Sequence, residues 1–372
     1  MSVEPFKISV PDAVLNDLRA RLNRTRWPDQ PEGAEWDYGT DTNFLQKICA
    51  YWADGFDWRA EEARLNASDH VRVTVDGFGL HALRRPSGDP KAIPLLVMHG
   101  WPSSFIQMMP FLAALPMAED AHGVSFDVVV ASLPGYGFSD VPATRGMNMA
   151  RAGELMAGLM TALGHERFAI RASDVGAGIA RQICLSAPDR VTRLHISGTN
   201  PFVPPKLPPD LSPEEEAFVE AARAWNLAEG GYAHMHVTKP QTVAHALLDT
   251  PVGLASWILE KFRAWGDIDG DPVARFGRDA LLTNLTIYWA TGTIGSSMRL
   301  YFENVRDPGK MGRVEVRTGA LMGPADMFPT PRAWAERAYN IISWNEAEAG
   351  GHFLEWEEPD AVAHDLCEFL AG

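Results

Sequence analysis

The stretch Phe168-Ala-Ile-Arg-Ala-Ser-Asp-Val-Gly-Ala-Gly-Ile179 decides the fold that we expect for this chain. It begins as an apolar run, narrows to the small residues Ala172 and Ser173, and passes through Asp174 into an apolar pattern typical of a helix. A strand that turns sharply into a helix needs small side chains at the turn, because the two backbone segments approach closely. The spacing matches a nucleophile elbow, small-x-nucleophile-x-small-small, with Asp174 at the nucleophile position.

The identity of residue 174 limits the chemistry. Serine at an elbow suits acyl transfer, whereas its attack on an sp³ carbon would leave an ether that water does not cleave. A carboxylate that attacks such a carbon forms an ester, which water can hydrolyse. Asp174 therefore indicates displacement at a strained or activated carbon, such as an epoxide or a carbon–halogen bond. The competing interpretation is that Asp174 only caps the N-terminus of the helix, where Asp is common.

Composition argues against several classes of protein. The chain has 372 residues, of which 46% are hydrophobic, enough for one large core and an accessory layer. A net charge of −15 argues against nucleic acid and anionic membrane surfaces as partners. The three cysteines are far apart and form no CxxC, which indicates a reducing compartment. With no signal-like N-terminus and no apolar run of about twenty residues, we expect no membrane span and a cytoplasmic location. A homodimer is compatible with the sequence, which does not reveal the oligomeric state.

Short apolar runs alternate with helical patterns over most of the chain. Wholly apolar runs are typical of strands covered on both faces, as in a parallel sheet. We therefore expect an α/β fold with a mostly parallel, doubly wound sheet, whose ligands bind beyond the carboxyl ends of the strands. The strands predicted with the elbow strand are Ile93–Met98, Phe126–Ala131, Val191–Ser197, Val314–Leu321 and Tyr339–Trp344.

Two segments depart from this alternation. Residues 1–90 are predicted to form an N-terminal arm. It would contain a helix from Pro11 to Leu22, a second helix near 41–54, and a hairpin around Asp76-Gly77. Residues 201–290 read as an inserted helical cap, with a proline-rich beginning and a capping box at Ser212–Glu215. Residues 91–200 and 291–372 would then form the sheet domain.

Two further residues stand at predicted strand ends. His352 lies in the loop Ala349-Gly-Gly-His-Phe-Leu354, and Asp326 follows the strand that ends near Leu321. Alone, His352 could be structural and Asp326 a solvated carboxylate. Together with Asp174 they follow the order nucleophile, acid, histidine, which is the order of α/β-hydrolases. Asp326 would then orient His352, and His352 would draw a proton from water.

Several motifs then make the resemblance specific. The chain resembles the microsomal-type epoxide hydrolases over nearly its whole length, which implies the α/β-hydrolase fold, hydrolysis of a small-molecule epoxide by water, and no cofactor. On this resemblance, Tyr232 and Tyr301 would hold the epoxide oxygen, and the backbone N–H groups of Trp101 and Val175 would form the oxyanion hole. The motifs are Phe6-Lys-Ile-Ser-Val-Pro-Asp12, His99-Gly-Trp-Pro102, Pro134-Gly-Tyr-Gly-Phe-Ser139, Gly231-Tyr-Ala-His-Met-His236 with Thr238-Lys-Pro240, Tyr288 to Ile294, and Ser296 to Tyr301.

The chain also departs from the family pattern. The family commonly has Trp after the nucleophile, where this chain has Val175; the backbone donor remains while the pocket wall changes. Arg171, three residues before Asp174, needs a partner if it is buried, and the sequence does not identify one. His234 and His236 invite a metal site, but no carboxylate or Cys lies at ligand spacing, so none is expected.

Two other functions are alternatives to epoxide hydrolysis. A haloalkane dehalogenase would use the same ester, but it holds the halide with an indole N–H, usually from the Trp that Val175 replaces. A non-catalytic ligand-binding relative would have lost turnover, against which Asp174, His352 and Asp326 all argue. The aromatic residues of the cap indicate an apolar or aromatic epoxide, whose identity and stereochemistry the sequence does not reveal.

Overall fold

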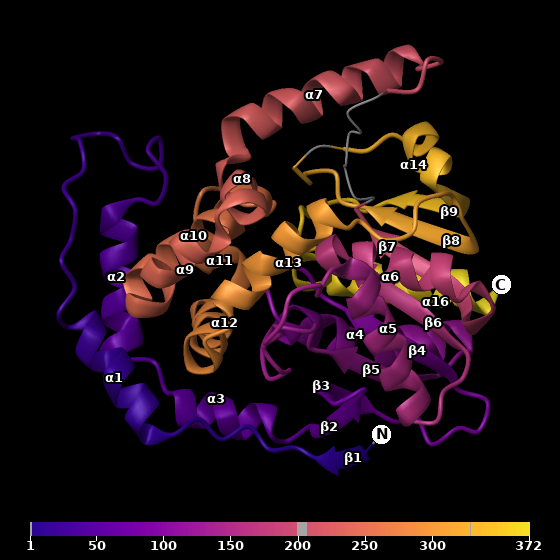
Figure 1. Cartoon of the computed structure of the whole chain (residues 1–372), viewed down its shortest axis with the longest axis horizontal. Coiled ribbons are helices and arrows are strands. Elements are labelled where there is room, and N and C mark those ends of the chain that lie inside the picture. Colours follow the sequence, from indigo (N-terminus) through magenta and orange to yellow (C-terminus); the bar gives the residue numbers. More distant parts are fainter. Residues whose placement is uncertain (1, 199–206, 328) are drawn as a thin grey trace.

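A computed structural model describes residues 2–198, 207–327 and 329–372 of the chain (Figure 1). Its described strands form one sheet of nine strands in the order β1-β2-β3-β5-β4-β6-β7-β8-β9. From β5 to β9 neighbouring strands run parallel, and the expected mostly parallel sheet is confirmed. The bounds are β1 (Ser2–Pro5), β2 (Asp69–Val75), β3 (Phe78–Arg85), β4 (Ile93–Met98), β5 (Phe126–Ala131), β6 (Phe168–Ser173), β7 (Val191–Ser197), β8 (Val314–Met322) and β9 (Tyr339–Glu346).

The central strands are buried because helices cover both faces of the sheet. Leu95, Leu96, Val97 and Met98 of β4 are each 0% exposed, as a wholly apolar run predicts. Helix α4 packs against α16, and α5 packs against α6, so that two pairs of helices flank the sheet (Figure 1). The helices of this part are η1 (Phe105–Gln107), α4 (Met108–His122), α5 (Met149–Ala162), α6 (Asp174–Ser186), η2 (Pro188–Arg190), α14 (Arg332–Ala338), α15 (Leu354–Glu357) and α16 (Pro359–Ala371).

The N-terminal segment joins the sheet, a feature that its sequence did not reveal. Its hairpin, β2 and β3, forms as predicted, and β3 then pairs antiparallel with β5. Its helices contact the helices inserted after β7, and Trp52 donates its Nε1–H to Thr286 Oγ1 at 2.9 Å. The segment therefore supports both the sheet and the inserted helices. Its helices are α1 (Asp12–Leu22), α2 (Thr42–Asp54) and α3 (Trp58–Leu65).

Between β7 and β8 the chain forms a helical layer above the carboxyl ends of the strands (Figure 1). The predicted capping box at Ser212 and Glu215 is confirmed, whereas Pro201, Pro204 and Pro205 lie outside the described residues. The helical layer extends past residue 290, since α13 packs against α8 and α9 before the chain returns to the sheet at β8. The helices are α7 (Pro213–Glu229), α8 (Gly231–Thr238), α9 (Pro240–Asp249), α10 (Pro251–Trp265), α11 (Pro272–Phe276), α12 (Arg278–Thr291) and α13 (Ile294–Arg306).

No single helix in the described ranges is long and apolar enough to cross a membrane. Helices α9 and α10 reach that length and composition only as a pair, and they are bent by 117° relative to each other.

Two buried histidines connect the N-terminal segment to the core. The carbonyl oxygen of Leu65 can only accept, so His70 donates from Nε2 at 2.8 Å. His70 Nδ1 then accepts from His81 Nε2 at 2.9 Å, and His81 Nδ1 accepts from the hydroxyl of Ser132 at 2.8 Å. Burial lowers the pKa of His70 and, more strongly, the pKa of His81, so both rings are neutral at pH 7 and adopt this pattern of donors and acceptors.

We expect the free energy of unfolding to fall as the pH is lowered from 7.5 to 5. The unfolded histidines take up protons near their ordinary pKa, whereas the native rings do not, so the stability is present above about pH 6.5 and is lost below it. The slope should approach about 1.4 kcal/mol per pH unit for each histidine. Urea denaturation of His70→Gln should show a flatter pH dependence than the wild type. The same change at exposed His245 is the control, and equal slopes for all three proteins would contradict the assignment.

Candidate active site

The nucleophile elbow forms where the sequence places it. β6 ends at Ser173, and Asp174 begins α6 with a φ of 47°, a left-handed conformation that side chains other than glycine rarely adopt. A Cβ on Gly176 would lie 2.6 Å from the backbone oxygens of Met98 and His99, which explains the small residue there. The N-cap position belongs to Ser173, so the interpretation of Asp174 as a simple helix cap is wrong.

Two backbone N–H groups point at the Asp174 carboxylate. Trp101 N donates to Asp174 Oδ1 at 2.8 Å, and Val175 N also hydrogen-bonds the carboxylate. The register explains this proximity, because Met98 of β4 lies opposite Ala172 of β6. Burial alone would raise the pKa of Asp174, but His352 and the two N–H groups outweigh it and lower that pKa below its ordinary value. Asp174 is therefore an anion at neutral pH.

His352 bridges two carboxylates. Its Nδ1 lies 2.9 Å from Asp326 Oδ1 and its Nε2 lies 3.4 Å from Asp174 Oδ2. Burial opposes the imidazolium, yet the charge of Asp326, its hydrogen bond to Nδ1 and the nearby charge of Asp174 raise the pKa of His352 well above its ordinary value. The structure thus brings together the three residues that the sequence selected, at the ends of β6, β8 and β9.

The loop that carries His352 is held by the end of α10. The backbone N–H of His352 donates to the carbonyl of Trp265 at 2.8 Å, and Gly350 N donates to Asp267 Oδ2 at 2.8 Å. A Cβ on Gly351 would lie 2.6 Å from the Trp265 carbonyl, so only glycine permits this approach. Gly351 therefore serves close packing between the loop and the inserted helices, whereas Gly350 adopts a φ of 104° that favours glycine.

Tyr232 and Tyr301 lie in an aromatic cluster on the side of the inserted helices. The Tyr232 ring stacks on Trp101 with centroids 5.1 Å apart, and the Tyr301 ring lies 6.3 Å from Trp101. Burial and the charge of Asp174 raise the pKa of both phenols, so both keep their protons at neutral pH. The two predicted tyrosines thus lie within electrostatic reach of the predicted nucleophile.

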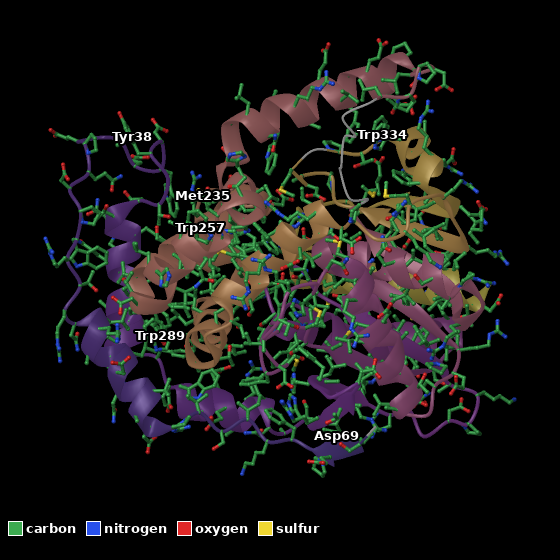
Figure 2. The ribbon with its side chains drawn as sticks, viewed as in Figure 1. Tyr38, Asp69, Met235, Trp257, Trp289 and Trp334 are labelled. Carbon is green, nitrogen blue, oxygen red and sulfur yellow. The ribbon has the colours of Figure 1, made fainter. Side chains whose placement is uncertain are left out.

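His236 fills the space between these rings. Its Nε2 accepts from the indole N–H of Trp257 at 3.3 Å, and Trp257 lies among the inserted helices (Figure 2). The neutral ring therefore carries its proton on Nδ1, which has no hydrogen-bond partner within the described part of the chain. Burial lowers the pKa of His236 to about 3, so the ring stays uncharged beside the tyrosines.

Arg171 has the partner that the sequence did not reveal. Its Nη2 donates to Glu355 Oε1 at 2.9 Å, and both side chains are 0% exposed. Its Nη1 donates to His195 Nδ1 at 2.8 Å, so the proton of that ring lies on Nε2 and faces Asp365 at 2.6 Å. The other oxygen of Glu355 accepts from Gln107 at 2.7 Å. A clue was present in the sequence, because Glu355 follows His352 by three residues in an otherwise apolar run.

This buried pair connects three segments of the site. Arg171 lies in β6, the strand before Asp174. Glu355 lies three residues after His352, and Gln107 lies shortly after the loop that contains Trp101. A buried ion pair is costly, and it is retained here together with a further hydrogen bond from Arg171 Nη2 to Ser197 Oγ, while Arg171 Nε has no hydrogen-bond partner within the described residues. We therefore interpret it as a link that holds these segments in register.

Comparison with known proteins identifies consistent relatives. The models of two families match, described as "Epoxide hydrolase N terminus" over residues 3–108 and "alpha/beta hydrolase fold" over residues 93–228. A provisionally named epoxide hydrolase of Stigmatella aurantiaca is 40% identical and covers 98% of this chain, which spans 84% of that protein. "Epoxide hydrolase 1" of Oryctolagus cuniculus is 34% identical over 99% of this chain and 89% of its own length.

A solved structure agrees with these relatives. The structure of Aspergillus niger epoxide hydrolase superimposes with a TM-score of 0.89 at 27% identity, covering 100% of this chain and 96% of that one. The resemblance inferred from the motifs is therefore confirmed along the chain.

We expect the Arg171–Glu355 pair to matter far more for stability than an exposed pair. Arg171→Met or Glu355→Leu alone leaves a buried charge without its partner and should lower the free energy of unfolding by roughly 3 to 5 kcal/mol. The double substitution removes both charges and should recover most of that loss. Urea denaturation measures all three, with exposed Arg332→Met and Glu336→Leu as controls expected to change stability by less than about 1 kcal/mol. Additive losses in the double variant would contradict a direct coupling.

Proposed function

This chain belongs to the epoxide hydrolases, and on that premise we propose that it opens an apolar or aromatic epoxide to a vicinal diol through an ester of Asp174. The setting of that carboxylate supports the proposal most directly. Its side chain is 23% exposed, faces two N–H donors, and lies 3.4 Å from His352 Nε2. An anion held in this way is poised to attack carbon.

In the first step, an oxygen of Asp174 forms a bond to one epoxide carbon. The ring C–O bond breaks, and its electron pair stays on the departing oxygen. An alkoxide is a poor leaving group at neutral pH, so Tyr232 and Tyr301 hold the oxygen and one phenol donates its proton. The products of this step are a glycol monoester of Asp174 and a phenolate.

In the second step, water attacks the carbonyl carbon of the ester and gives one proton to His352. The tetrahedral oxyanion lies against the backbone N–H groups of Trp101 and Val175. When the intermediate collapses, the diol oxygen leaves and takes the proton from His352. The newly formed Asp174 carboxylic acid then gives its proton to His352, which restores the carboxylate and the imidazolium of the resting enzyme.

Formation of the ester also makes His352 available as a base. In the resting enzyme two carboxylate charges raise the pKa of His352. Formation of the ester removes the charge of Asp174, so the pKa of His352 falls. The imidazolium then loses its proton, which passes through solvent to the phenolate, and the neutral imidazole can accept a proton from water. Asp326 remains charged and keeps the ring oriented through Nδ1.

The preference for apolar substrates is supported by the aromatic rings of Trp101, Tyr232 and Trp265, which pack together near Asp174. We further propose a cytoplasmic location, because all three cysteines are free and buried, as expected in a reducing compartment. Detoxification is the role that we propose for the reaction, because it converts a reactive epoxide into a diol.

Substitution of the base should trap the ester. His352→Gln should still react with styrene oxide but should not hydrolyse the product, so intact-protein mass spectrometry should show one added epoxide, located on the peptide that contains Asp174. In a single turnover of the wild type in ¹⁸O water, label should enter Asp174 and be absent from the diol. Asp174→Ala is the control and should neither form the adduct nor turn over. Label appearing first in the diol would rule out the covalent route.

Removal of the orienting carboxylate should change the pH dependence of ester hydrolysis. The charge of Asp326 raises the pKa of His352, so Asp326→Asn should lower that pKa and move the inflection of the hydrolysis rate to lower pH. The plateau at high pH should also fall, on the order of 100-fold, because a weaker and less well oriented base removes the proton from water. Rapid-quench measurement between pH 5 and 9 resolves this step. An unchanged inflection would show that Asp326 does not act on His352.

A further inference from the structure

Lys261 is a buried cation beside one of the two site tyrosines. It lies on α10, its side chain is 8% exposed, and its Nζ is 5.0 Å from the centroid of the Tyr232 ring. The same ammonium lies 5.7 Å from the Trp265 ring. A lysine is rarely buried, because its ammonium loses hydration, and cation–π contacts offset only part of that loss. Neither step of the proposed reaction uses the charge of Lys261.

Lys261 also neutralises a nearby carboxylate. Its ammonium forms an ion pair with Glu260, the preceding residue, whose side chain is 21% exposed. After burial and the charge of Asp174, the charge of Glu260 is a further cause that raises the pKa of Tyr232. The phenol thus lies near the carboxylates of Asp174 and Glu260, with the ammonium of Lys261 over its ring. The remaining neighbours, His236 and Tyr301, are neutral.

We propose that Lys261 is a positioning residue for ring opening, which acts through Tyr232 by favouring release of the phenol proton to the epoxide oxygen. The inference rests on the proposed role of Tyr232. As the epoxide C–O bond breaks, its electron pair moves to oxygen, the proton passes from Tyr232 to that oxygen, and negative charge moves onto the phenol. An ammonium over the ring stabilises that charge, and it also cancels the opposing effect of Glu260.

The sign of the charge near Tyr232 should determine how fast the ester forms. Lys261→Met keeps an unbranched apolar side chain but leaves Glu260 uncompensated, so formation of the ester should slow by about tenfold. Glu260→Gln leaves the ammonium uncompensated, so ester formation should be as fast as in the wild type or faster. The double variant has neither charge and should be clearly faster than Lys261→Met alone. Hydrolysis of the ester, which takes no proton from Tyr232, should be unchanged in all three.

Stopped-flow measurement with styrene oxide separates the two steps. Arg263→Met is a matched control, because Arg263 lies on the same helix and over an aromatic ring, that of Trp36 at 4.7 Å, which belongs to no part of the proposed site. This control should change neither rate. Equal slowing of Lys261→Met and the double variant would show that packing, and not charge, explains the effect and would overturn the proposal. So would equal slowing of ester formation and hydrolysis by Lys261→Met.

Tyr232→Phe distinguishes failure of this inference from failure of the proposed function. If Tyr232→Phe slows ester formation but Lys261→Met does not, the role of Tyr232 stands and the role of Lys261 is refuted. If Tyr232→Phe leaves ester formation unchanged, the proposed role of the tyrosine fails, and the inference about Lys261 fails with it. If both single variants slow ester formation, Lys261→Met should have little further effect in the Tyr232→Phe background, because no phenol remains for the charge to act on.

Discussion

One buried imidazole between two carboxylates sets the demands on the rest of the structure. His352 lies 2.9 Å from Asp326 and 3.4 Å from Asp174, and each of these residues follows a different strand. Charges taken out of water are stable only when partners are held at such distances, since the loss of one partner leaves an uncompensated charge. The parallel sheet provides this precision, because the ends of β6, β8 and β9 lie at one edge of a rigid layer.

The same arrangement serves both halves of the proposed reaction. While Asp174 is charged, it shares the imidazolium with Asp326, and its own low pKa keeps it ready as a nucleophile. Once it is esterified, only Asp326 remains to orient the ring. In the proposed reaction, the loss of charge on forming the ester therefore also produces the base that removes it.

The inserted helices act as part of the site as well as its cover. The end of α10 holds the His352 loop through the Trp265 carbonyl, and the same helix carries Lys261 beside Tyr232. The N-terminal segment lies against the outer side of these helices (Figure 1), and Trp52 donates a hydrogen bond to Thr286 there. His352, Asp174 and the two tyrosines thus belong to one packed body, whose parts are far apart in the sequence.

Local patterns explain why so much of the sheet could be predicted. Predicted strands such as Phe126–Ala131 and Val191–Ser197 formed with those bounds, and the small residues around Asp174 became the elbow. By contrast, the pairing of β3 with β5 depends on hydrogen bonds between residues about fifty positions apart, which no local pattern encodes.

The sequence by itself determined the chemistry that this chain can perform, because residue types and strand-end motifs are local properties. It therefore sufficed to select Asp174, His352 and Asp326, and the resemblance added Tyr232 and Tyr301. Only the tertiary structure decided which charges meet. Arg171 and Glu355 are 184 residues apart in the chain, and Lys261 approaches Tyr232 from a different helix. Electrostatic effects depend on distance in space and on the exclusion of water, and both exist only once the helices have packed over the sheet.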